Sequence, residues 1–296
     1  MNLVSKVAVT LQAVIQHPVN RHRKLKALFE YPFIQIAARL VPGHVCVEFP
    51  NRTLLLVSPR MKGAAHYITP RLFEFENMAF VMHFLRPSDL FVDVGANIGA
   101  FTIMAAAVVG ARTVTFEASP DTYAMLASNI RLNGVQDRAR ALNCAAGRSE
   151  GTTQFSVGLG TENFVVTNGN AGAVTVKMTT LDKELAGSSP DLLKVDVEGF
   201  EVEVFAGATK TLRDPKLRAI IVERKDISLR YGFDENKLHR EIRECGFVSC
   251  SYRPFDRELV QINDDARGDI IYVRDISAAN ALLRSAPPFS LGQFSV

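Results

Sequence analysis

Three acidic residues stand close together in the stretch LLKVDVEGFEVEVFAGA, which covers residues 192–208. Asp196, Glu198 and Glu201 follow an apolar run that predicts a buried strand, and apolar residues recur at helical spacing after Gly199. Carboxylates that crowd one strand end raise the pKa of at least one of them, so that it can accept a proton near neutral pH. For Glu198 and Glu201 the alternative is a favourable contact with the N-terminus of the following helix. The stretch therefore predicts a general base, a charged helix end, or both.

A second stretch, DLFVDVGANIGAFTIM at residues 89–104, predicts a buried strand, a tight turn and a buried helix. Gly95 and Gly99 give the turn a permissive backbone, which lets a ligand or a neighbouring element come close. Ala96 stands where a dinucleotide fingerprint has its second glycine, and no lysine follows Gly99 as in a P-loop. The turn from Gly95 through Asn97 to Gly99 is therefore a candidate binding loop without a good phosphate cradle.

Glu117 ends the next predicted strand, 22 residues after Gly95. An acid at about this distance reaches a ribose hydroxyl in nucleoside-binding βαβ units. A ribose without a neighbouring phosphate fits S-adenosylmethionine. We expect Asp93 to face the ammonium of its methionine moiety, and Gly95 to Gly99 to lie against its carboxylate and sulfonium end. The alternative is an ordinary buried α/β turn with a surface acid at Glu117.

The composition sets limits on the class of protein. The chain has 296 residues and 47% hydrophobic content, which is enough for a sizeable core. A net charge of +3 predicts no nucleic-acid partner. The four cysteines show no C-x-x-C spacing, so we expect no zinc and a reducing compartment. No run approaches the ~20 apolar residues of a spanning helix, and Lys6 interrupts the early apolar stretch, so we predict a cytoplasmic protein without a signal peptide.

The N-terminal part predicts a separate extension. Residues 3–16 carry apolar side chains at helical spacing, and a basic cluster from Arg21 to Lys26 follows. We expect this helix to cap the main domain or to pair with a second copy, and the alternative is a weak peripheral contact with a membrane. Residues 45–58 predict short β runs around a turn at Pro50-Asn51, and residues 74–85 predict a helix that leads into the core.

Five segments together resemble the FkbM-type S-adenosylmethionine-dependent methyltransferases: FVDVGANIGAFT, FEASP, NCAAG, TTLD and LLKVDVEGFEVEVFAGA. The resemblance covers roughly residues 74–223 and implies a Rossmann-like class I α/β fold and O-methylation, typically of hydroxyls on sugars or natural products. Phe200 often corresponds to a smaller residue in the second motif, so it alters the shape of the nearby pocket. The cofactor motifs match Asp93, Gly95, Asn97, Gly99 and Glu117, and the second motif matches Asp196, Glu198, Gly199 and Glu201.

The resemblance also sets the expected architecture. Further strands predicted at residues 219–222, 246–248 and 269–273 would complete a sheet of seven strands with the last one antiparallel. A strand over residues 140–145 would end beside the adenine, which makes Asn143 and Cys144 cofactor-binding candidates. The alternating segment 152–178 predicts an inserted hairpin that acts as a lid. The expected division is an extension at 1–73, a methyltransferase domain at 74–280 and a tail at 281–296.

The mechanism implied by that cofactor needs an acceptor oxygen in line with the methyl group and a group that takes up its proton. We predict Asp196 as the proton acceptor, with Glu198 or Glu201 holding neighbouring hydroxyls of the substrate. A divalent ion bridging Asp196 and Glu198 is the alternative, but no cluster of His or Asn accompanies them, so we predict no metal. Glu223, which follows the strand at 219–222, is a candidate substrate contact or a solvated strand end.

Two rival classes of function stay open. An NAD-dependent oxidoreductase would use the same sheet and Glu117, although the third-glycine spacing of its fingerprint is missing. A non-catalytic S-adenosylmethionine-binding protein would keep Asp93 and Glu117 but would need no cluster of carboxylates at the second turn.

Overall fold

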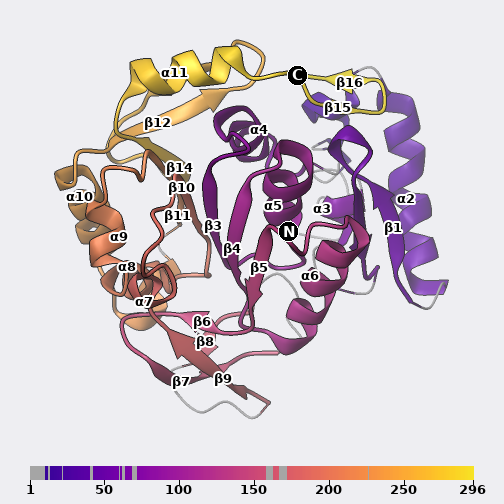
Figure 1. The fold of residues 1–296 in the computed structure, drawn as a ribbon. Coiled ribbons are helices and arrows are strands. Elements are labelled where there is room, and N and C mark those ends of the chain that lie inside the picture. Colours follow the sequence, from indigo (N-terminus) through magenta and orange to yellow (C-terminus); the bar gives the residue numbers. More distant parts are fainter. Residues whose placement is uncertain are drawn as a thin grey trace.

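A central sheet of eight strands runs through the molecule in this computed structural model (Figure 1). The structure describes residues 11–12, 14–21, 23–40, 43–59, 61, 64–68, 72–157, 163–166, 172–225 and 227–296. In spatial order the strands are β13 (Glu258–Gln261), β12 (Val248–Arg253), β14 (Gly268–Val273), β11 (Ala219–Arg224), β10 (Leu192–Val195), β3 (Leu90–Val94), β4 (Arg112–Phe116) and β5 (Ala139–Leu142).

The sheet confirms the predicted Rossmann-like α/β class. The pairs β4–β5, β3–β4, β3–β10 and β10–β11 are parallel, and β14 is antiparallel to both of its neighbours, β11 and β12. The seven-strand prediction is corrected in one respect, because β13 adds an eighth strand beyond β12. The sequence pattern predicts no strand between residues 248 and 269. The strand β13 is an edge strand with only Leu259 deeply buried, so its apolar pattern is weak.

Helices cover both faces of this sheet, as the buried strands require. One core cluster joins Phe91 and Ile221 to α4 (Phe75–Phe84), α5 (Ala100–Ile103) with its π-helical continuation η3 (Met104–Val109), α6 (Pro120–Leu132) and α11 (Ile276–Ser285). The other joins Val92 and Val195 to α7 (Leu181–Glu184), α8 (Glu201–Ala206), α9 (Thr209–Arg213) and α10 (Glu235–Glu244). Burying each large apolar side chain contributes roughly 1.5–3 kcal/mol, so the parallel strands are held firmly and their carboxyl ends are fixed in place.

The predicted inserted hairpin is part of a second sheet with four strands, in the order β6-β9-β7-β8. Its members are β6 (Ala145–Ala146), β7 (Gly151–Phe155), β8 (Val165–Val166) and β9 (Val174–Thr179). The single strand predicted over 140–145 is therefore wrong in its extent: β5 ends at Leu142, and Ala145 pairs with Met178 of β9 instead. This sheet lies below the carboxyl ends of β4 and β5 in the view of Figure 1.

The N-terminal part packs against the central fold. It contains η1 (Pro18–Asn20), α2 (Lys24–Leu40), β1 (Val45–Glu48), η2 (Pro50–Arg52), β2 (Leu54–Val57) and α3 (Ala64–Ile68). The hairpin β1–β2 turns at Pro50-Asn51 as predicted, and the Asn129 side chain of α6 bonds to both backbone groups of Leu56. Most of the amphipathic helix predicted over 3–16 lies outside the described residues; residues 11–12 and 14–16 are helical.

At the other end, the chain closes with β15 (Ser290–Leu291) and β16 (Phe294–Ser295) beside the N-terminal part, and η5 (Ile227–Tyr231) follows β11. Among the described residues, no helix combines the length and the apolar character that crossing a membrane requires.

Candidate functional site

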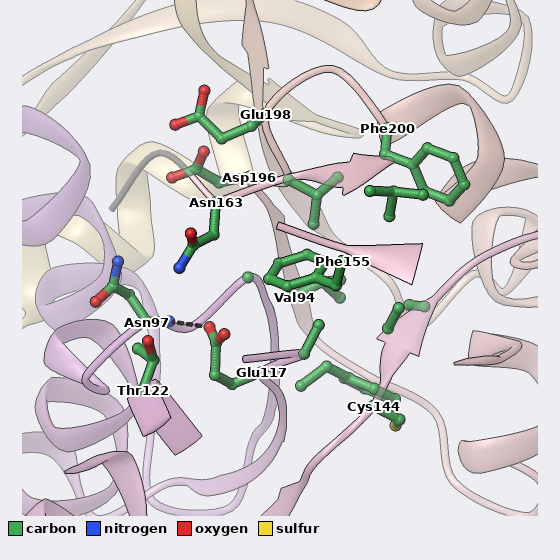
Figure 2. Close-up of a pocket in the computed structure, with 17 residues that line it drawn as sticks. Val94, Asn97, Glu117, Thr122, Cys144, Phe155, Asn163, Asp196, Glu198 and Phe200 are labelled. Carbon is green, nitrogen blue, oxygen red and sulfur yellow. Dashed lines mark hydrogen bonds between the residues drawn. The ribbon is translucent and has the colours of Figure 1, made fainter. Parts of the chain in front are cut away.

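A pocket opens where β3, β4 and β10 end (Figure 2). Its lining residues surround about 580 Å³ of space, part of which is open to solvent. Its floor comes from the two strand-end turns and its far wall from the second sheet. The lining residues are Val94, Gly95, Asn97, Phe116, Glu117, Ala118, Thr122, Cys144, Ala145, Ala146, Phe155, Asn163, Val165, Asp196, Val197, Glu198 and Phe200.

The turn after β3 uses all of its backbone N–H groups inside the protein. The N–H groups of Gly95 and Ala96 both donate to the Phe116 carbonyl at 3.0 Å. Asn97 N donates to Glu117 Oε2 at 2.9 Å. Ile98 N donates to the Asn97 side chain at 2.8 Å, and Gly99 N donates to the Ala96 carbonyl. A phosphate cradle needs free N–H groups that point at the ligand, so this turn cannot serve as one without giving up these bonds.

The two glycines of this turn serve close packing. Gly95 has φ +81°, and a Cβ built on it would lie 1.8 Å from the backbone oxygen of Asp196. Gly99 has φ +92°, and its Cβ would lie 2.5 Å from Leu126 Cδ1 of α6. Gly95 therefore lets the turn after β3 touch the turn after β10, and Gly99 lets the helix that follows pack on α6.

Glu117 connects the first turn to the pocket. Its Oε2 accepts the bond from Asn97 N, and its Oε1 accepts one from Ser119 N at 2.8 Å. Burial raises the pKa of Glu117 to about 7, while these two bonds pull it down. The carboxylate faces the cavity beside Thr122 in Figure 2, so its remaining lone pairs point where a ribose hydroxyl can bind.

Asp93 lies beneath the turn and does not line the pocket. It is fully buried, and its Oδ2 accepts a bond of 2.8 Å from the Thr102 hydroxyl of α5, which also contacts Thr115 of β4 at 3.0 Å. Burial raises the pKa of Asp93, and the nearby Lys194 ammonium opposes that rise. The structure thus places Asp93 where it positions α5 on the sheet, not where it would face a ligand directly.

Of the two residues predicted to lie beside the adenine, one lines the pocket and the other does not. Cys144 lines the pocket, and burial raises the pKa of its thiol to about 11, so it presents a neutral surface. Asn143 instead donates from Nδ2 to the carbonyls of Glu117 and Ala118 at 2.9 and 3.2 Å, which ties β5 to the end of β4. Phe155 of β7 lies across the pocket from Cys144 (Figure 2), so the inserted sheet supplies one wall.

The inserted sheet and the second turn also meet through aromatic rings. Phe200 lines the pocket and packs edge-on against Tyr231, with 5.4 Å between ring centroids. The Tyr231 hydroxyl donates to the Val165 carbonyl of β8 at 2.8 Å. Phe200 therefore narrows this side of the pocket, and Tyr231 anchors the strand that carries Val165. The sequence reasoning missed Thr122, Phe155, Asn163 and Val165, because their place at the pocket depends on how the second sheet folds over the first.

The three acids of the second turn lie in three different environments. Asp196 lines the pocket with 32% of its side chain exposed, and its Oδ2 accepts a bond of 2.9 Å from the Lys194 ammonium. Glu198 also lines the pocket and holds a left-handed backbone with φ 54°, a conformation that is strained for a glutamate. Of the predicted trio, these two face the cavity.

Glu201 faces away from the pocket. It is only 3% exposed, and its Oε1 accepts bonds from Val197 N at 3.0 Å and from Gly199 N at 3.2 Å. Burial raises the pKa of Glu201 to about 7, and the backbone bonds oppose that rise. The structure therefore shows Glu201 holding the turn together at the start of α8, which agrees with the alternative of a charged helix end.

Lys194 is a site residue that the sequence reasoning missed. It stands in β10 with 4% of its side chain exposed, and its ammonium lies 4.7 Å from the centroid of the Phe101 ring. Asp196, then Glu74 and Asp93, raise the pKa of Lys194 against the effect of burial, so the lysine stays charged. The sequence does contain a signal for Lys194, because a lysine in an otherwise apolar buried strand needs acidic partners and so indicates a cluster of charged residues.

A second cavity adjoins the first on the other side of the two turns. The pockets share Gly95, Asn97, Asp196 and Glu198. The second cavity is further lined by Tyr67, Phe73, Glu74, Ala96, Ala100, Phe101, Lys194, Glu223 and Lys225. Glu223, a predicted substrate contact, thus faces this cavity and pairs with Lys225. Burial raises the pKa of both Glu74 and Glu223 to about 7.

Within the part of the chain that the structure describes, no group of three or more His, Cys, Asp or Glu residues is arranged to hold a metal ion. The carboxylates of Asp196 and Glu198 therefore lack a third ligand of these types there. Asp196 has a cationic partner in the Lys194 ammonium.

Comparison with known proteins places these features in a family context. The model of the methyltransferase FkbM domain matches residues 93–249. The methyltransferase sdnD of Sordaria araneosa is 32% identical over 158 residues, which cover 41% of this chain and 61% of that protein. The hexuronic acid methyltransferase AglP of Haloferax volcanii is 30% identical over 142 residues, which cover 46% of this chain and 55% of that protein. The chain thus spans between half and two thirds of the length of these curated relatives.

Among solved structures, the S-adenosylmethionine-dependent methyltransferase of Agrobacterium tumefaciens is similar, with 12% identity and a TM-score of 0.44 over 79% of this chain and 71% of that one. The range matched by the family model includes both strand-end turns and the inserted sheet.

Proposed function

We propose, from the premise that the chain belongs to the FkbM methyltransferase family, that it methylates a hydroxyl group of a sugar, a glycan or a natural product. The cofactor of this family is S-adenosylmethionine. The observation that carries the proposal is the first pocket, where Glu117 faces the cavity and no lysine or arginine stands among the described lining residues. A nucleoside without phosphate fits such a wall, whereas a pyrophosphate does not.

The residues of the first pocket suit the parts of this cofactor. Glu117 would hold the ribose hydroxyls with the lone pairs that its two backbone bonds leave unused. Ala118, Cys144 and Phe155 would form the apolar slot for the adenine. The positively charged end would then lie toward Asp196 and Glu198, which supply the negative charge at the rim shared by the two pockets.

When bound, the cofactor supplies an electrophilic methyl group on a positively charged sulfur. Methyl transfer would form a bond from the acceptor oxygen to carbon and break the bond from sulfur to carbon, so a protein group would have to take up the proton of the hydroxyl. We assign Asp196 as the group that takes this proton, because its carboxylate faces both pockets while Glu201 is turned inward. The Lys194 ammonium holds Asp196 in place at 2.9 Å. Glu198 lies beside it and can accept a neighbouring hydroxyl of the acceptor.

The acceptor class is supported by one relative. The protein from Haloferax volcanii is named a hexuronic acid methyltransferase, and it matches 46% of this chain. We therefore propose a sugar hydroxyl as the first acceptor to test.

Three further expectations stay proposals. We propose a cytoplasmic location, because the four cysteines are unpaired as in a reducing compartment. We propose the division at residues 73/74 and 280/281 as the domain plan. We also propose that the helix predicted over residues 3–16 caps the main domain or pairs with a second copy, or else contacts a membrane weakly. Leu25, Phe29 and Phe33 of the neighbouring helix α2 are exposed, which would suit either of the last two contacts.

A thermal shift experiment tests the cofactor. S-adenosylhomocysteine at about 100 times its Kd should stabilise the fold by roughly 2.7 kcal/mol and raise the Tm, whereas NAD should leave the Tm unchanged. Stabilisation by NAD alone would instead support the oxidoreductase. Transfer of a labelled methyl group to a sugar then separates an enzyme from a protein that only binds the cofactor.

A further inference from the structure

The second cavity is placed to receive the methyl acceptor, on the premise of the proposed function. Among the residues that the structure describes, it shares Gly95, Asn97, Asp196 and Glu198 with the first pocket. Asp196 is therefore within reach of both cavities. A cofactor whose adenosine occupies the first pocket would present its reactive end to this shared rim, and a hydroxyl in the second cavity would meet it there next to Asp196.

The described wall of the second cavity carries more negative than positive groups. Four carboxyl groups line it, and two ammonium groups accompany them. Both ammonium groups already have carboxylate partners, because Lys194 pairs with Asp196 and Lys225 pairs with Glu223. Glu74 then adds a carboxyl group that belongs to neither of these two pairs.

A further carboxyl group lies just behind this wall. The Asn77 side chain donates both to Glu74 Oε2 at 3.2 Å and to Asp269 Oδ2 at 2.8 Å, so one amide links the two acids. Burial raises the pKa of both, and Asp196 adds to the rise in each case. Another anion brought into this cavity would meet this repulsion without a free cation among the described lining residues.

The cavity also has an apolar side. Tyr67 and Phe73 pack edge to face with 4.8 Å between ring centroids, and Phe101 lies below the Lys194 ammonium. Aromatic rings next to carboxylates suit a pyranose, since its C–H face packs on a ring and its hydroxyls donate to carboxylate oxygens. Tyr67, Phe73 and Glu74 come from the segment before the strand β3, so this segment shapes the acceptor side of the site.

We propose that the second cavity binds the methyl acceptor and selects a neutral or amine-bearing sugar over one that carries a carboxylate. Glu74 is the residue that sets this preference. Once Glu74 is ionised, which at its pKa of about 7 requires an assay at about pH 8.5, an ammonium on the acceptor can pair with it and a neutral hydroxyl can donate to it. A carboxylate on the acceptor is then repelled by it.

A matched set of acceptors tests the proposal: the aryl glycosides of a hexose, of the corresponding aminohexose and of the corresponding hexuronic acid. Transfer from S-adenosylmethionine with a labelled methyl group gives kcat/KM for each, and calorimetry with S-adenosylhomocysteine gives the cofactor Kd in the same preparation. We expect kcat/KM for the hexuronide to be at least about tenfold lower than for the other two, the scale of one unfavourable charge contact.

The variant Glu74→Gln should reduce the ratio of kcat/KM between the hexoside and the hexuronide by about threefold or more. It should leave the cofactor Kd within about twofold of the wild type. Its control is Glu76→Gln, two residues further along in the first turn of α4, because Glu76 is exposed and does not line the cavity. The control should keep the ratio of the wild type.

Three results would overturn the proposal while leaving the methyltransferase assignment intact. They are a hexuronide that is methylated as well as the hexoside, a set in which no glycoside is methylated although the cofactor product binds, and a Glu74→Gln variant that loses cofactor affinity instead of changing acceptor preference. The last result would show that the amino-acid end of the cofactor fills this cavity. Failure of S-adenosylhomocysteine to bind at all would instead contradict the proposed function itself.

Discussion

The turns after β3 and β10 are stabilised in the same way, but the glutamate that stabilises each turn faces a pocket in one and the protein interior in the other. Each turn contains a non-glycine residue in the left-handed region, Asn97 in the first and Glu198 in the second. Each is also held by a buried glutamate that accepts backbone N–H bonds, Glu117 from Asn97 and Glu201 from Val197. Burial raises the pKa of both glutamates to about 7.

The difference lies in the direction of the carboxylate. Glu117 lines the first pocket, so its unused lone pairs are available to a ligand, whereas Glu201 lines neither pocket and serves the turn alone. On the second turn, Asp196 and Glu198 occupy the exposed side instead. An acid at a strand end is therefore a candidate for function only if the packing turns it outward.

The largest effect is expected at Asp196. Asp196→Asn keeps the shape but removes the basicity, so turnover should fall by roughly 10²–10⁴ while the affinity for S-adenosylhomocysteine stays near that of the wild type. Single-turnover transfer of a labelled methyl group measures the turnover, and calorimetry measures the affinity.

The matched controls are Glu198→Gln on the same turn and Glu201→Gln behind it. Lost cofactor affinity with normal turnover at saturating cofactor would make Asp196 a binding residue. A larger loss of turnover in either control would move the proton acceptor to that glutamate.

The contact between the two turns is tested at Gly95. A Cβ at this position would lie 1.8 Å from the Asp196 backbone oxygen, and backbone cannot rotate away as a side chain can. Gly95→Ala should therefore lower the free energy of unfolding by about 3 kcal/mol or more, measured by chemical denaturation.

Gly99→Ala is the comparison, because its Cβ meets the flexible end of Leu126 and its φ is equally left-handed. We expect a cost of only about 1–2 kcal/mol there. Equal costs at the two positions would show that backbone strain alone, and not the approach of the two turns, requires Gly95.

Affinity for the cofactor should separate the two buried glutamates. Each carboxylate oxygen of Glu117 accepts one backbone N–H bond. In Glu117→Gln the side-chain NH₂ group replaces one of these oxygens, so two donors face each other and the contact with the ribose is disturbed. S-adenosylhomocysteine should bind more weakly by about 1–3 kcal/mol in calorimetry. Glu201 accepts both of its bonds on Oε1, so Glu201→Gln can keep them and should leave the affinity unchanged. Unchanged affinity in Glu117→Gln would remove Glu117 from the ribose site.

The smallest effect concerns pH and Glu201. Its pKa is about 7 in the folded protein, against an ordinary value of 4.5, so the folded state holds a proton that the unfolded state has lost between these two values. The free energy of unfolding therefore falls as pH rises from 4.5 to 7, and this term is absent in Glu201→Gln.

Urea denaturation at pH 4.5 and at pH 8 gives the free energy of unfolding of the variant and of the wild type. The value for the variant minus that for the wild type should be higher at pH 8 than at pH 4.5, by on the order of 1–3 kcal/mol. Glu74, Glu117 and Glu223 titrate in both proteins, so their effects cancel in this difference. A difference that stays constant over this range would mean that Glu201 is ionised throughout in the folded protein.

Much of the core could be predicted because its signals are local. The strands β3 and β10 appear as short apolar runs, and Ser119-Pro120 marks the start of α6, where the Ser119 side chain accepts a bond from Thr122 N. The edge strand β13 could not be predicted in the same way, because only Leu259 in it is deeply buried and its apolar pattern is weak. The split between β5 and β6 could not be predicted either, because Ala145 pairs with Met178, which lies far along the chain.

The site residues also divide into those with a local signal in the sequence and those that only folding brings to the site. Glu117 and Asp196 were predicted from their distance to the glycines and from the strand ends they occupy. Lys194 was missed because it stands inside a strand that was assigned to the core, and Glu74 was missed because only folding brings the segment before β3 next to the second turn.

By itself, the amino-acid sequence determined the order of strands, turns and helices and the acids at the strand ends, because hydrophobic periodicity and glycine positions act over a few residues. Only the tertiary structure decided which of those acids face a cavity. Asp93 and Glu201 accept bonds within the protein and do not line the pocket, whereas Glu117, Asp196 and Glu198 line it. The reason is physical: where a carboxylate points depends on hydrogen-bond donors and packed side chains that come from elements distant in the chain.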